Sequence, residues 1–423
     1  MAAILSTISL VFGALHFVQL RSPRGVPFLA FRLLAAALAP FMALCGLIGA
    51  VLGLKQRNIL AGAMGALGLI ASTQYVGRIA AVAPPQRRPV APPPRARHPV
   101  LDVPFATVPL PASNGPGKRA LYCDIWQPPP DAKPSSVAIL YLHGSSWYLG
   151  DKGMLTRPLF RVLTGAGHVV MDIAYRMCPE TDITGMIGDA LRAVAWMRDH
   201  AVEYGVDPER IVLAGTSAGG QIAILAAYMT NRTDVIPPEL AGRDLSVSGV
   251  VAISAPLDMR AILRHHPFLI ESAHPAPGMA YDPLTDVDPL PPPPPGSGRR
   301  ERRRWQEMQA RRITGLLHDL VGGGPEDAAE KYDLATAGTH VRPGLPPTLI
   351  IQGEYDMLVP VEPARALVRQ LRAAHVPVDY VELPQTDHGF DLALPQISPP
   401  AHVAIQAILR FLEVHQPIQQ TED

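Results

Sequence analysis

The chain of 423 residues has little cysteine, and its first hundred residues contain no acidic side chain. Its three cysteines, Cys45, Cys123 and Cys178, are odd in number and form no Cys-x-x-Cys pair, which excludes a disulfide scaffold and a structural zinc site of that spacing. Residues 1–101 carry ten basic residues and no Asp or Glu, whereas the remainder holds 27 basic and 37 acidic residues. Because this larger part would repel phosphate, the composition argues against a nucleic-acid binder.

Charge is also absent from three long apolar stretches, at residues 4–20, about 33–54 and about 59–77. Their lengths are close to the ~20 residues that a helix needs to cross a bilayer. No basic segment follows Met1, which argues against a cleaved signal peptide. We therefore expect a multi-pass transmembrane region over residues 1–82, with three spans and two as the alternative. Three spans favour a cytoplasmic C-terminal part by the positive-inside rule, whereas two would overturn that orientation.

Residues 83–99 are rich in proline and arginine, and residues 100–423 alternate between two patterns. The first segment predicts a semi-rigid linker. In the second, short β-branched runs at 136–142, 167–172, 210–215, 248–253, 348–352 and 378–383 alternate with helical stretches at 153–165, 184–205, 218–230, 361–375 and 400–414. This alternation predicts an α/β domain with a mostly parallel sheet covered by helices on both faces. Ligands of such folds bind at the carboxyl ends of the strands.

One serine stands where such a site would be. Gly215-Thr216-Ser217-Ala218-Gly219 follows the predicted strand at 210–215 and precedes the predicted helix at 218–230. Gly-x-Ser-x-Gly between a strand and a helix is typical of a nucleophilic serine held on a tight turn. The helix N-terminus behind it also favours negative charge. The alternative is a serine that only caps the helix.

A base and an acid follow two later strands. Asp356 comes after the run at 348–352, and His388 comes after the run at 378–383. The order Ser, Asp, His along the chain is that of the α/β-hydrolase arrangement. We therefore expect Ser217 to be the nucleophile, His388 its general base and Asp356 the residue that orients the imidazole. Glu354 is the competing acid, and we interpret Asp387 as a turn residue.

A third motif follows the strand at 136–142, and it carries a family resemblance. His143-Gly144-Ser145-Ser146-Trp147 is followed by Gly150-Asp151-Lys152, and a Tyr-Arg-x-x-Pro-Glu sequence begins at Tyr175. Together with Ser217, Asp356 and His388, these motifs resemble the carboxylesterases of the α/β-hydrolase superfamily, in particular its hormone-sensitive-lipase-like and BD-FAE-like branches. The resemblance covers residues 115–414 and implies the α/β-hydrolase fold.

The resemblance also implies an oxyanion hole. Its donors would be the backbone N–H groups of Ser145, Ser146 and Ala218, with His143 and Gly144 shaping the loop. This sequence has two serines where the family usually has glycine, and serine tolerates fewer backbone angles. Trp147 is expected to pack either beside the acyl site or in the core.

Residues 258–345 form an insert between the strands at 248–253 and 348–352, and we interpret it as a cap or lid. It contains five consecutive prolines at 291–295 and seven arginines within 299–312. The arginines are typical of a solvated loop, and the alternative is a contact with an anionic membrane surface.

These patterns together predict a membrane-anchored serine carboxylesterase that forms an acyl-enzyme intermediate and needs no cofactor or metal. The anchor favours apolar or lipid-like esters as substrates. The lipid bilayer is the other expected partner, through the N-terminal helices. Two alternatives stay open for the substrate, a prenylcysteine methylesterase-like and an arylformamidase-like hydrolase. A third alternative is a catalytically inactive hydrolase-fold domain that serves as a binding module at the membrane.

Overall fold

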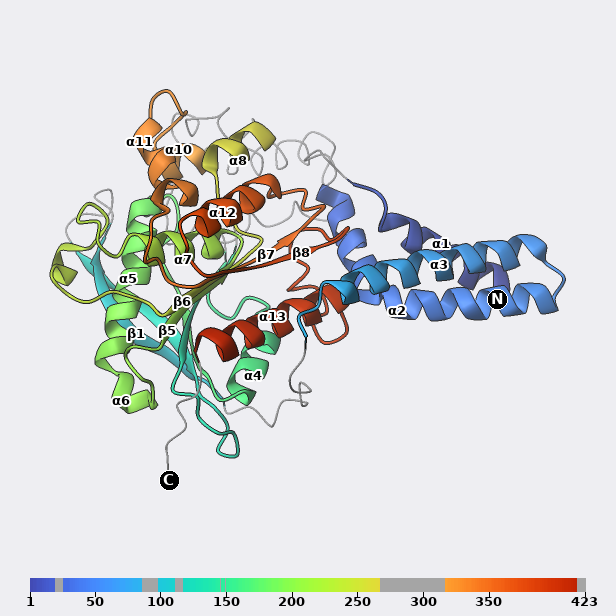
Figure 1. The fold of residues 1–423 in the computed structure, drawn as a ribbon, viewed down its shortest axis with the longest axis horizontal. Helices are drawn as coiled ribbons and strands as arrows, with labels where there is room; N and C mark the ends of the chain where they lie inside the picture. The colour runs from blue at the N-terminus through green and yellow to red at the C-terminus, as the bar shows by residue number, and fades with distance from the viewer. Residues whose placement is uncertain are drawn as a thin grey trace, which may run out of the picture.

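The computed structural model joins an elongated N-terminal helical bundle to a C-terminal α/β domain (Figure 1). It describes residues 1–19, 26–85, 98–110, 117–144, 146–148, 150–266 and 316–416. The segment predicted as a linker therefore lies largely outside the described residues, and its boundaries stay predictions.

The bundle consists of α1 (Ala2–Leu15), α2 (Val26–Lys55) and α3 (Ile59–Ala81). By length and composition α2 and α3 qualify as membrane spans. Helix α1 has 14 residues, which is about 21 Å at 1.5 Å per residue, short of the ~30 Å hydrocarbon core. The structure thus gives two candidate spans, and the expectation of three is corrected at the first stretch, whose helix ends before His16.

Small residues let the three helices pack with their backbones close together. A Cβ added to Gly46 would lie 2.8 Å from the carbonyl oxygen of Gly65, and one added to Gly68 would lie 2.6 Å from the carbonyl carbon of Ser9. The Ser9 hydroxyl also donates a hydrogen bond to the carbonyl of Met42, at 2.7 Å. Such small-residue contacts with interhelical hydrogen bonds are typical of membrane helix packing.

The C-terminal domain is built on one sheet of eight strands in the order β1-β2-β4-β3-β5-β6-β7-β8. Its strands are β1 (Val100–Pro109), β2 (Lys118–Trp126), β3 (Ala138–Leu142), β4 (Val169–Ile173), β5 (Ile211–Thr216), β6 (Gly249–Ile253), β7 (Thr348–Gly353) and β8 (Val378–Leu383). Pairing is antiparallel between β1, β2 and β4 and parallel from β4 to β8. All six predicted strands are present, and the prediction of a mostly parallel sheet is confirmed. The two antiparallel strands β1 and β2 were not predicted.

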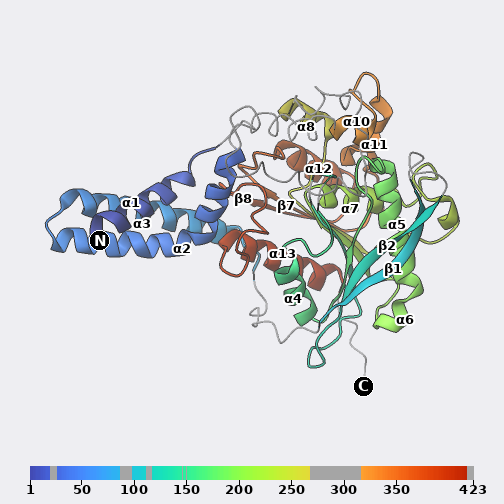
Figure 2. The ribbon, with the colours of Figure 1, turned by 180° about the vertical axis from the view of Figure 1, so that it is seen from behind.

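Two helical layers cover the sheet. The helices of the domain are α4 (Arg157–Gly165), α5 (Ile183–Asp199), α6 (Ala201–Tyr204), α7 (Ala218–Tyr228), α8 (Met259–His265), α10 (Leu316–Val321), α11 (Ala329–Leu334), α12 (Glu362–Ala373) and α13 (Pro399–His415). Side chains of α5, α7 and α12 share one buried cluster with one face of the sheet, and those of α4 and α13 share a second cluster with the other face. Figure 2 shows α4 and α13 on their side of the sheet.

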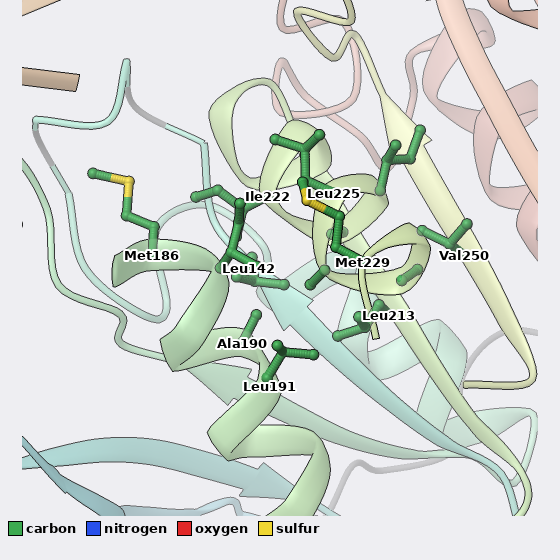
Figure 3. Packing of buried hydrophobic residues seen from close by; sticks show 14 of the residues in the cluster. Leu142, Met186, Ala190, Leu191, Leu213, Ile222, Leu225, Met229 and Val250 are labelled. Atoms are coloured by element: carbon green, nitrogen blue, oxygen red, sulfur yellow. The ribbon is translucent and has the colours of Figure 1, made fainter. Parts of the chain in front are cut away.

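The first cluster shows how alternation along a strand builds the core. Leu213 faces α7, whereas its neighbours Val212 and Ala214 belong to the cluster on the opposite face. In Figure 3, Leu142, Leu213 and Val250 from three adjacent strands lie beneath Ile222 and Leu225 of α7. All five side chains are buried, and burying each contributes roughly 1.5–3 kcal/mol. This packing fixes α7, and with it the turn that precedes the helix, against the sheet.

Between β6 and β7 the described residues form α8, α10 and α11. The prolines at 291–295 and the arginines at 299–312 lie outside the described residues, so both interpretations of the arginines, a solvated loop and the alternative membrane contact, stay predictions.

The helical bundle packs against the second cluster. Ala36 and Ala39 of α2 and Tyr75 and Ile79 of α3 are buried together with side chains of α13. In both ribbon views the bundle leaves the domain beside β8 and α13 (Figures 1 and 2). The helices thus meet the domain at the carboxyl edge of β7 and β8.

Candidate active site

Ser217 lies on the turn between β5 and α7, at the carboxyl edge of the sheet. Its φ and ψ angles are 52° and −125°, a conformation that is costly for a residue with a side chain and is concentrated at functional sites. The glycines around it are required by space, because a Cβ on Gly219 would overlap the carbonyl oxygen of Leu142, and one on Gly215 would overlap the backbone of Gly219.

The structure brings His388 and Asp356 to this serine from two other strand ends. His388 Nε2 lies 3.1 Å from Ser217 Oγ, and His388 Nδ1 lies 2.8 Å from Asp356 Oδ2. His388 follows β8 and Asp356 follows β7, so three strand ends supply the three side chains.

The Asp356 carboxylate is held by donors on both oxygens. Oδ1 accepts hydrogen bonds from the backbone N–H groups of Leu358 and Val359, at 3.0 and 2.8 Å. Oδ2 accepts from Gln352 Nε2 at 3.0 Å, in addition to His388. Because the carboxylate oxygens only accept hydrogen bonds here, the contact with Asp356 favours the His388 tautomer with its proton on Nδ1.

Buried carboxylates control the electrostatics around His388. Burial alone would lower the pKa of His388. The charge and hydrogen bond of Asp356, together with the charges of Asp391 and Asp387, outweigh burial, and the pKa lies above its usual value. Burial also raises the pKa of Asp391, whose Oδ2 accepts a hydrogen bond from the Thr216 hydroxyl at 2.9 Å. Asp391 and Gln352 carry no motif, and sequence reasoning missed them both.

Two other acidic residues, Glu354 and Asp387, make contacts that the sequence did not predict. The Glu354 carboxylate accepts a hydrogen bond from the backbone N–H of Gln385, at 2.9 Å, whereas Asp356 is the acid that contacts His388. Asp387 does more than complete a turn. Its Oδ1 accepts from the backbone N–H groups of both Met357 and His388, at 2.9 and 2.8 Å.

The loop after β3 lies beside the serine. A Cβ added to Gly144 would lie 3.1 Å from Ser217 Cβ, so this backbone approaches the nucleophile closely. Ser146 is exposed with φ 54°, in the left-handed region that glycine adopts without strain. Ser145, the other predicted donor of this loop, lies outside the described residues, while Ala218 is the first residue of α7.

His143 and Trp147 fix this loop to the domain. The His143 ring donates from Nδ1 to the carbonyl of Gly144 at 2.9 Å, and its own carbonyl accepts from the Tyr175 hydroxyl at 2.8 Å. Trp147 is buried within the main core cluster, and its indole N–H donates to Gln221 Oε1 at 2.9 Å. The core position expected as one alternative for Trp147 is therefore the observed one. Within the described residues no group of three His, Cys, Asp or Glu side chains is arranged to hold a metal.

Comparisons with known proteins agree with this architecture. Residues 123–278 match the BD-FAE family and residues 293–392 match a family described as the alpha/beta hydrolase fold. The probable carboxylic ester hydrolase LipM of Mycobacterium tuberculosis is 30% identical over 303 residues, which cover 71% of this chain and 59% of LipM. Esterase LipQ of the same organism is 28% identical over 66% of this chain and 56% of its own length. The chain thus spans somewhat over half the length of these relatives.

Solved structures resemble the fold. An esterase from Thermogutta terrifontis superposes with a TM-score of 0.51 at 23% identity, covering 72% of this chain and 91% of its own. Esterase B from Lactobacillus rhamnosis gives a TM-score of 0.53 at 19% identity, covering 83% and 94%. With its strand order, its serine turn and the two family matches, the C-terminal part of this chain belongs to the α/β-hydrolase superfamily, among the families that contain carboxylic ester hydrolases.

Proposed function

We propose that the chain is a membrane-anchored serine carboxylesterase. One observation carries the proposal: a continuous hydrogen-bonded chain runs from Ser217 Oγ through both ring nitrogens of His388 to Asp356. This is the geometry that converts a hydroxyl into a nucleophile. The named relatives, which are ester hydrolases, support the choice of ester chemistry.

In the proposed reaction, Ser217 Oγ attacks the carbonyl carbon of the ester while His388 Nε2 takes the hydroxyl proton. The Asp356 carboxylate stabilises the imidazolium that forms. His388 then gives the proton to the departing alcohol oxygen as the carbon–oxygen bond breaks, which leaves an acyl group on Ser217. Water, deprotonated by His388, attacks the acyl carbon. The bond between this carbon and Ser217 Oγ then breaks, His388 returns the proton to Oγ, and the carboxylic acid leaves.

The negative oxygen of the tetrahedral intermediate needs donors near Ser217. The backbone N–H of Ala218, at the start of α7, is one proposed donor, and the helix N-terminus adds a favourable dipole. The N–H groups of Ser145 and Ser146 are the others. Because these donors belong to the backbone, serine can supply them as well as glycine does, at the cost of the strained φ angle of Ser146.

The helices α2 and α3 support membrane anchoring. Their most apolar windows have mean hydropathies of 2.2 and 1.5, and only 39% and 33% of these windows are buried in the protein. A core helix of a soluble domain would be mostly covered, whereas here large apolar side chains such as Phe41, Leu47 and Ile70 are exposed. A bilayer would cover these side chains. An anchored active site then favours apolar or lipid-like esters, which partition into the membrane.

Turnover by the full-length chain in detergent micelles tests the esterase proposal. We expect hydrolysis of p-nitrophenyl esters across acyl chains of two to twelve carbons, about the range that separates esterases from lipases, and loss of turnover in Ser217→Ala. A folded chain with no turnover and no labelling by a fluorophosphonate would instead support the inactive binding module.

Membrane extraction tests the anchor. The full-length chain should stay with the membrane pellet after washing with high salt and with alkaline carbonate, because burial of α2 and α3 in the bilayer is not electrostatic. Release by salt alone would contradict the anchor while leaving the esterase proposal intact.

A further inference from the structure

The N-terminal helices contact the two loops that carry Asp356 and His388. Arg32 of α2 places its Nε 3.3 Å from Asp387 Oδ2, and the two side chains are only 3% and 2% exposed. The guanidinium carbon of Arg32 also lies 5.7 Å from the centre of the Tyr355 ring. Asp387 precedes His388 and Tyr355 precedes Asp356, so one arginine touches the neighbours of both residues.

Asp387 links these loops through its other oxygen. Its Oδ1 accepts from the N–H of Met357, directly after Asp356, and from the N–H of His388. Burial raises the pKa of Asp387, and the charge of Arg32 together with these two N–H groups opposes that rise. The Arg32 guanidinium therefore favours the ionised carboxylate that holds the loops together.

Helix α3 adds a second contact on the same loop. The hydroxyl of Tyr75 lies 3.2 Å from Thr386 Oγ1, and Thr386 itself donates to the carbonyl of Pro384 at 3.0 Å. Since the threonine hydroxyl has a single proton, Tyr75 is the donor to Thr386. The Tyr75 side chain is fully buried, and its ring stacks on His16 of the segment after α1, with centroids 4.0 Å apart.

We propose that Arg32 is a positioning residue for the hydrolytic reaction, so that the membrane helices align His388 and Asp356 as well as anchoring the chain. This inference rests on the proposed function. Without Arg32, the buried Asp387 carboxylate would lose its counter-charge, which is strongly unfavourable. It would take up a proton or leave its pocket, and either change weakens its bonds to the N–H groups of Met357 and His388.

The test uses the full-length chain in detergent micelles and compares five variants. Arg32→Met keeps much of the side-chain volume and removes the charge, while Arg32→Lys keeps the charge. Asp387→Asn and the double variant Arg32→Met/Asp387→Asn complete a double-mutant cycle. Arg78→Met is the matched control, because Arg78 is an exposed arginine near the end of α3. Thermal unfolding reports the folding of each variant independently of the alignment of His388.

We expect Arg32→Met to lower kcat by roughly 100-fold with little change in KM, since a misplacement of about 1 Å in an active site can cost that much. Arg32→Lys should recover most of the loss. The double variant should be more active than Arg32→Met alone, because it removes the uncompensated carboxylate. Arg78→Met should match the unmodified protein. Equal kcat in Arg32→Met and the unmodified protein would overturn the inference, and so would a folded double variant that recovers nothing.

The pH profile gives a readout that a purely structural contact would not move. The charged and titratable groups around His388 are Asp356, Asp387, Asp391, His266 and, behind Asp387, Arg32. Removing the negative charge in Asp387→Asn should lower the pKa on the acid side of the kcat/KM profile, because that charge raises the pKa of His388. Arg32→Met should lower it too, because Asp387 without its counter-charge takes up a proton or moves away from His388. Shifts in opposite directions, or none in either variant, would contradict the proposed role.

Failure of this inference and failure of the proposed function give different results. If the unmodified protein turns over esters and Ser217→Ala does not, the proposed function stands whatever Arg32→Met does. If the unmodified protein neither turns over esters nor reacts with the fluorophosphonate, the proposed function fails, and with it the positioning role.

Discussion

Replacing Asp356 by asparagine should lower kcat far more than the loss of one charge alone would. Both carboxylate oxygens accept hydrogen bonds only: Oδ1 from the N–H groups of Leu358 and Val359, and Oδ2 from Gln352 and His388. An asparagine NH₂ must replace one of these oxygens, and it then faces donors on either side. Turned toward His388, it would favour the tautomer with the proton on Nε2, which cannot accept the proton of Ser217.

We therefore expect Asp356→Asn to lower kcat by ~10⁴-fold, which corresponds to about 5 kcal/mol of transition-state stabilisation. Steady-state hydrolysis of a p-nitrophenyl ester by the full-length chain measures this loss. Glu354→Gln is the matched control, because it makes the same chemical change two residues away and affects one hydrogen bond to the backbone of Gln385. If Glu354→Gln abolished turnover and Asp356→Asn preserved it, the assignment of the acid would be wrong.

Three further predictions concern the base, the loop after β3 and the serine turn. Because the pKa of His388 is raised above its usual value, kcat/KM should fall with decreasing pH through that raised pKa as His388 becomes protonated, which a pH-rate profile measures. Ser146→Gly should keep kcat, since the backbone N–H remains, and should stabilise the protein by up to about 1 kcal/mol in thermal unfolding, because φ is 54°. Gly219→Ala should prevent folding, because its methyl group overlaps the carbonyl of Leu142, whereas Gly77→Ala, with no atom within 4 Å of the new methyl group, should fold normally.

Each of these predictions has a contrary result. A kcat/KM that is flat between pH 5 and 8, about the range where a histidine titrates, would show that His388 is not the base. Loss of turnover in a folded Ser146→Gly would mean that the hydroxyl of Ser146 takes part in the reaction. A folded and active Gly219→Ala would contradict the close contact between the serine turn and β3.

The central sheet could be predicted because its strands follow a strong local rule. Strands β3 to β7 are buried runs of β-branched and aliphatic residues, and β8 is a mostly half-buried one. Each is separated from the next by a helical stretch or the insert, so periodicity alone indicates them. Strands β1 and β2 lie at the antiparallel edge, and β1 contains Pro104 and Pro109. Proline is tolerated at a sheet edge but argues against a strand when the sequence is examined alone.

In the site, too, residues with a local motif could be predicted, whereas a contact between residues far apart along the chain could not. Ser217, Asp356 and His388 each carry a short motif after a strand, so sequence could nominate them. Arg32 could only be interpreted as a basic residue flanking a membrane span, because its partner Asp387 lies more than three hundred residues away along the chain. No periodicity or spacing in a single sequence records that contact.

The position of Arg32 relative to the membrane also follows from the fold and not from the sequence pattern. From Leu33 to the end of α2 at Lys55 the helix runs for about 34 Å at 1.5 Å per residue. This length is sufficient to cross the ~30 Å hydrocarbon core. If this part of α2 spans the membrane, the pair of Arg32 and Asp387 lies at the membrane surface, together with the loop of His388.

The most direct test of the whole account is labelling of the full-length chain by a fluorophosphonate, with the modified residue identified by mass spectrometry. The account predicts stoichiometric modification of Ser217 in the unmodified protein, none in Ser217→Ala, and much slower modification when His388 is replaced by alanine. Labelling that persists in Ser217→Ala, or a folded protein that does not react at all, would contradict an esterase built on this serine.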